Sequence, residues 1–82
     1  MKNLIFLTAE ELELAIFLGL PVDSQKIYLS IEELTYIVDT LGDLFVKLGL
    51  NENDEPNELG LKIENLLDTF NRPRIQGKKQ KN

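Results

Sequence analysis

The chain has 82 residues with no cysteine and no histidine, and its formal net charge is −5 at pH 7. This length suffices for one small core, and the missing residue types exclude disulfides, thiolate metal sites, and the commonest general base and transition-metal ligand. The charge is uneven, because residues 1–71 hold all 14 acidic residues and only four lysines. Such an acidic body disfavours contact with nucleic-acid phosphates.

The first predicted helix covers residues 9–18 and begins with a capping box. Thr8 is a favoured N-cap residue, and Glu11 stands three positions later, where its carboxylate can reach back to the cap. Gly19 suits the left-handed position that follows a helix, and Pro21 prevents the helix from continuing. Both ends of this helix are therefore marked in the sequence.

The second predicted helix covers residues 31–48 and begins with the same pattern, 22 residues further along the chain. Ser30 and Glu33 form its capping box, and Gly49 is predicted to be its left-handed C-terminal residue. Convergence of good helix starts explains the repeated pattern more simply than an ancestral duplication does.

The third predicted helix begins near Pro56, because proline suits the first helical position. It ends near Asn71, because the residue before Pro73 is pushed out of the helical region. Gly60 is expected only to weaken the first turn, by roughly 1 kcal/mol relative to alanine.

No apolar periodicity continues beyond the third helix. We therefore expect a single helical domain over residues 1–72 and a disordered basic tail over residues 73–82.

Residues 3–7 and 26–29 are short apolar segments with aromatic or branched members, and each is interpreted as a strand that leads into its helix. A β-α-β crossover would pair them in parallel. The predicted fold class is therefore mainly α, a small three-helix domain with a short two-stranded β element preceding helices 1 and 2.

The first helix has more apolar residues than one core face requires. Leu12, Ala15 and Ile16 are predicted to face the core. The apolar residues that remain on the rest of the helix are Leu14, Phe17 and Leu18. A large exposed apolar patch usually marks an interface, so a homodimer is favoured, with a foreign partner or a cover formed by the strand segments as alternatives.

The outer face of the second helix carries a stripe of acidic residues around a tyrosine. The stripe consists of Glu32, Tyr36, Asp39 and Asp43. A solvated face is the simpler interpretation, and a contact surface for a basic partner is the functional one.

Residues for catalysis or for cofactor binding are not apparent. The acidic pairs are adjacent in helices and point apart, and no glycine-rich phosphate loop is present. The segment that starts at Asn51 loosely resembles a calcium loop, but Pro56 and Lys62 replace its required glycine and closing glutamate. We expect no enzyme activity, no metal and no cofactor.

The C-terminal basic residues offer a possible nucleic-acid contact. They are Arg72, Arg74, Lys78, Lys79 and Lys81. No aromatic residue accompanies them for base stacking, so a nucleic-acid-associated protein is only the alternative function.

The sequence favours a small non-enzymatic regulator, an inhibitor or adaptor, that binds another protein through apolar and acidic helix surfaces. In style it resembles small bacterial or phage-encoded regulators. The apolar run Leu4–Leu7 is too short to span a membrane, and a cytoplasmic location is expected.

Overall fold

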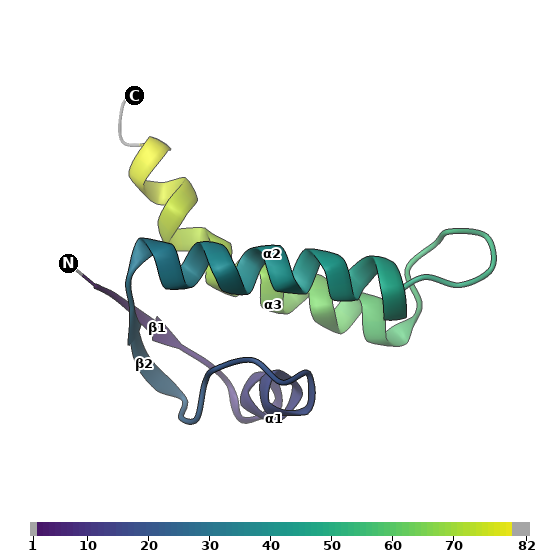
Figure 1. Ribbon diagram of the computed structural model, residues 1–82, viewed down its shortest axis with the longest axis horizontal. Coiled ribbons are helices and arrows are strands. Elements are labelled where there is room, and N and C mark those ends of the chain that lie inside the picture. Colours follow the sequence, from purple (N-terminus) through teal and green to yellow (C-terminus); the bar gives the residue numbers. More distant parts are fainter. Residues whose placement is uncertain (1, 80–82) are drawn as a thin grey trace.

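The computed structural model describes residues 2–79, and it describes side chains as far as Pro73. The elements in chain order are β1 (Asn3–Phe6), α1 (Ala9–Phe17), β2 (Lys26–Leu29), α2 (Ile31–Leu48) and α3 (Glu58–Lys79). Helices α2 and α3 run side by side as a hairpin, and the two strands and α1 lie on one side of it (Figure 1). The predicted fold class, three helices with a two-stranded sheet preceding α1 and α2, is confirmed.

Both predicted capping boxes are present. The Thr8 hydroxyl accepts a hydrogen bond of 3.1 Å from the Glu11 amide, and the Glu11 carboxylate accepts one of 2.8 Å from the Thr8 amide. The Ser30 and Glu33 pair repeats this exchange at 3.1 and 2.7 Å. These reciprocal bonds satisfy amides that have no partner within the helix, which explains why α1 and α2 begin where they do.

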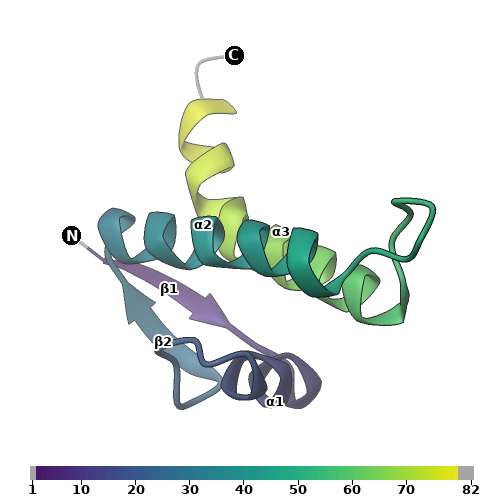
Figure 2. The ribbon, with the colours of Figure 1, turned by 45° about the vertical axis from the view of Figure 1, so that its right-hand side comes forward.

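The strands pair in antiparallel, so the predicted parallel crossover is wrong. The segment that follows α1 is anchored in the core by Leu20 and Val22 and therefore does not return to the start of β1. Instead, the Leu7 amide donates to the Gln25 carbonyl at 2.7 Å, so the end of β1 lies beside the start of β2. Helix α1 thus forms part of a long hairpin connection at one end of the sheet (Figure 2).

The core fills the space between the helical hairpin and the layer formed by the strands and α1. Its fully buried members on α2 and α3 are Leu34, Ile37, Leu41, Ile63, Leu66 and Phe70. Ile5 and Leu29 contribute from the strands and Ala15 from α1. No polar or charged residue is buried in the part of the chain whose side chains are described, so this core is held by apolar packing.

The glycines at the helix ends have two different roles. Gly19 has a φ of 81°, which confirms its predicted left-handed conformation. Gly49 has a φ of −99°, so the same prediction for the end of α2 is wrong. A Cβ added at Gly49 would lie 2.8 Å from the Cα of Gly60, and one added at Gly60 would collide with the Gly49 carbonyl. These two glycines allow the backbones of α2 and α3 to touch.

Helix α3 begins later and ends later than predicted. Pro56 lies before the helix, and the Asn57 side chain caps α3 by accepting a 2.7 Å hydrogen bond from the Gly60 amide. The predicted end near Asn71 is wrong, because α3 continues through Pro73 to Lys79. Proline removes one helical hydrogen bond and kinks a helix without always ending it.

The kink is visible where the last part of α3 turns away from α2 (Figure 1). Residues 73–79 of the predicted tail therefore belong to α3, and residues 80–82 lie outside the described residues.

Candidate functional site

Helix α1 is covered on more sides than the sequence suggested, but not on all. Ala15 is fully buried. The half-buried residues packed against the core are Leu12, Leu14 and Leu18. Ile16 was predicted to face the core but is 56% exposed, and Phe17 is 75% exposed. The exposed apolar surface of α1 is therefore concentrated at its C-terminal end.

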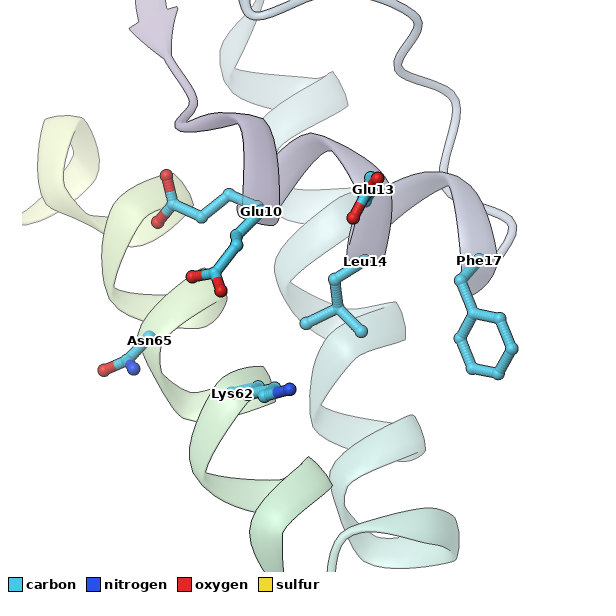
Figure 3. A pocket seen from close by; sticks show the side chains of 7 residues that line it. Glu10, Glu13, Leu14, Phe17, Lys62 and Asn65 are labelled. Carbon is cyan, nitrogen blue, oxygen red and sulfur yellow. The ribbon is translucent and has the colours of Figure 1, made fainter.

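A groove of about 360 Å³ lies between α1 and α3. It is lined by Glu10, Glu11, Glu13, Leu14 and Phe17 from α1 and by Lys62 and Asn65 from α3. Leu14 and Phe17 extend from the same side of α1, Phe17 at its C-terminal end, and Lys62 lies on α3 (Figure 3). Of the three apolar residues predicted for an interface, Leu14 and Phe17 line this groove, and Leu18 does not.

One side-chain hydrogen bond links α1 to α3. The Thr69 hydroxyl on α3 donates to the Glu11 carboxylate at 2.7 Å, while the second oxygen of that carboxylate serves the cap of α1. Glu11 therefore joins the start of α1 to α3. Because both ends of this bond are partly buried, it restrains the width of the groove.

The rim of the groove is mainly negative. Glu10 and Glu13 are exposed, and the described ion pairs, Lys2–Glu33 and Arg72–Asp68, include neither of them. Lys62 on the opposite wall is also exposed and outside these pairs. The groove thus combines an apolar wall with carboxylates that are available to an approaching cation.

The acidic stripe lies on one exposed face of α2. Glu32, Tyr36, Asp39 and Asp43 are all exposed, with Tyr36 at 61%. Glu32 and Tyr36 also line a second hollow of about 250 Å³ beside Pro21. Asp39 and Asp43 line neither hollow, so half of this stripe borders a concave surface and half does not.

The outer face of the sheet is an exposed apolar surface that the sequence analysis missed. Leu4 stands opposite Tyr28 in the register, and Phe6 is the next outward residue of β1. Their exposed fractions are 39%, 57% and 65% respectively. The position of Leu4 and Phe6 on either side of Ile5 could have indicated this surface. A strand with one solvated face buries every second residue, so its other residues are exposed.

The basic C-terminal residues are only partly described. The Arg72 guanidinium lies 3.4 Å from the Asp68 carboxylate, one helical turn earlier. Arg74, Lys78 and Lys79 have a described backbone within α3 but no described side chains, and Lys81 lies outside the described residues.

The described part of the chain contains no group of three or more carboxylate, imidazole or thiol side chains placed to hold a metal ion. None of its helices combines the length and the apolar character that crossing a bilayer requires. Comparison with known proteins finds no matching family model, curated protein or solved structure.

Proposed function

We propose that this protein is a small cytoplasmic regulator, an inhibitor or adaptor, that acts by binding another protein at the groove between α1 and α3. The observation that carries the proposal is Phe17, which is 75% exposed and lines the groove beside the half-buried Leu14. Burying a side chain of this size contributes roughly 1.5–3 kcal/mol, and the fold leaves most of that unused. Aromatic side chains are enriched in the buried centres of protein interfaces.

The surroundings of Phe17 support a protein ligand. Ile16, its neighbour on α1, is 56% exposed and enlarges the apolar area. Carboxylates at Glu10 and Glu13 border the same surface. An apolar centre with a polar rim is the usual organisation of a protein–protein contact.

A second copy of the chain fits this surface less well than a foreign partner. Helix α1 contains Glu10, Glu11 and Glu13, and it contains no basic residue. Two such helices placed against each other would bring like charges together, which opposes association. The acidic stripe on α2 could add steering charges for the same basic partner.

Two matched substitutions test the proposal. Phe17→Glu and Val46→Glu each place a carboxylate at an exposed apolar position, since Val46 is 66% exposed on α2. The partner captured by the unaltered protein from extracts of its own organism is identified first, and the affinity of both variants for that partner is then measured. We expect Phe17→Glu to abolish binding while Val46→Glu and the unfolding transitions of both variants change little.

Equal loss of binding in both variants, or retained binding in Phe17→Glu, would contradict the proposed site. Reversing the charges of Asp39 and Asp43 in a separate variant measures the contribution of the acidic stripe. Sedimentation of the unaltered chain at micromolar concentration tests the homodimer. A dimer that Phe17→Glu dissociates would support the homodimer.

A further inference from the structure

We infer that the ligand of the α1–α3 groove is an amphipathic helix whose polar face is basic, supplied by a partner protein. This inference rests on the proposed function and adds the shape and the charge of the bound segment. Its two independent observations are an apolar stripe of α2 that continues beyond its cover and the unpaired carboxylates on α1.

The shape follows from the apolar stripe of α2. Leu34 and Leu41 are fully buried, but Leu48, two further turns along the same face, is 45% exposed. Helix α1 crosses under the middle of the α2–α3 hairpin, and the end of the hairpin nearest the α2–α3 loop extends beyond it (Figure 1). The layer that covers the hairpin therefore ends at α1, on the side of α1 where Leu14 and Phe17 line the groove.

A helix laid in the groove, on this side of α1, would continue the missing layer. Packed helices lie 8–10 Å apart and bury a stripe of residues spaced three and four positions apart, which is how a groove of this kind recognises a partner. Its apolar stripe would contact Phe17 on one side and the uncovered face of the hairpin, at Leu48, on the other.

The charge of the ligand follows from the rim. Glu10 and Glu13 are exposed on the groove side of α1, and the described ion pairs do not include them. Lysine or arginine on the ligand would pair with these carboxylates. Lys62 on the opposite wall would form an ion pair with a single acidic residue of the ligand. Because the acids stand in the first half of α1 and Phe17 at its end, the basic residues of the ligand must lie toward the start of α1.

Two synthetic peptides of about 14 residues, or four helical turns, serve as probes. Both place leucines on one helical face, and their polar faces carry lysine in one peptide and glutamate in the other. Binding to the full chain is measured by fluorescence anisotropy, and the site is located by amide shifts in NMR spectra. We expect the lysine peptide to bind saturably, with shifts in α1 and around Lys62, and the glutamate peptide to bind at least about tenfold more weakly.

Substitutions separate this site from general attraction to an acidic protein. Phe17→Ala should weaken binding of the lysine peptide about tenfold or more, because it removes an apolar anchor. Glu10→Lys combined with Glu13→Lys should weaken binding of the lysine peptide severalfold and reduce the salt dependence of that binding. Asp39→Lys combined with Asp43→Lys makes the same change in net charge on α2 and should have a much smaller effect.

Several results would overturn the inference. They are equal affinity for both peptides, shifts confined to the α2 stripe, equal effects of the two charge reversals, and a chain that dimerises through this groove. The proposed function is judged separately, by the natural partner. If that partner loses binding to Phe17→Glu but contacts the groove through a segment that is not a basic helix, the function stands and this inference falls.

Discussion

Gly60→Ala tests whether the α2–α3 hairpin depends on direct backbone contact near its loop. A Cβ at position 60 would collide with the Gly49 carbonyl and lie 3.1 Å from the Gly49 Cα. All of these are backbone atoms, which no side-chain rotation can move away. The two helices must therefore separate, and packing along the hairpin is lost.

The magnitude follows from two opposing terms. Alanine is favoured over glycine inside a helix by about 1 kcal/mol. Overpacking costs about 1–3 kcal/mol, and a collision between backbones belongs at the upper end of that range. We therefore expect Gly60→Ala to lower the free energy of unfolding by up to about 2 kcal/mol.

Gly42→Ala is the matched control. Gly42 also lies in a helix, but a Cβ added there has no atom within 4 Å, so only the gain of about 1 kcal/mol remains. The two variants should thus shift the unfolding transition in opposite directions, at about 4–8 °C per kcal/mol for a chain of this size. Thermal and urea denaturation followed by circular dichroism measure this difference. A Gly60→Ala variant as stable as Gly42→Ala would refute the backbone contact.

Three further predictions concern the caps and the link between α1 and α3. Ser30→Ala should reduce stability by about 0.5–2 kcal/mol in chemical denaturation, and an unchanged midpoint would show that the Ser30 cap does not stabilise α2. The Ser30 amide, which donates to the Glu33 carboxylate, holds the pKa of that carboxyl below its ordinary value, with help from Lys2. A lowered folded-state pKa stabilises the fold above the unfolded pKa and loses that effect as the pH falls through the folded pKa. Glu33→Gln should therefore flatten the acid side of a curve of unfolding free energy against pH, and an unaltered curve would contradict this. Thr69→Val removes the hydrogen bond to Glu11, so it should cost about 1 kcal/mol and speed amide exchange in α1, whereas unchanged exchange would show that the bond does not hold this helix.

Local sequence signals predicted the starts of α1 and α2 well. The residues of each capping box are three positions apart, so the chain needs no distant partner to form them. The same is true of Gly19, whose left-handed conformation follows a helix end directly. These features depend on neighbours along the chain, which the sequence displays.

Features that depend on distant residues were predicted poorly. The strands β1 and β2 pair in antiparallel, and Gly49, whose φ is −99°, lies against the backbone of Gly60 in α3. Pro73 was predicted to lie beyond the end of α3, but the structure places it within the bent helix. In each case a tertiary contact or a tolerated kink decided between conformations that the sequence alone allows.

The sequence indicated one wall of the candidate site but not the other. The apolar excess on α1 indicated Leu14 and Phe17, because one helix face cannot bury so many large side chains. Lys62 and Asn65, on the opposite wall, are about 50 positions away in the chain and carry no local signal that links them to α1. The acidic stripe on α2 was predicted as an exposed face, and its residues are exposed.

Photo-crosslinking from position 17 tests whether a partner protein binds at the groove between α1 and α3. A photoreactive phenylalanine analogue replaces Phe17 in one protein and Val46 in a control, and both are illuminated in extracts of the organism that makes the chain. We expect one defined protein adduct from position 17 and none from position 46. Adducts of equal pattern from both positions, or adducts from position 46 alone, would contradict a binding site at the groove between α1 and α3.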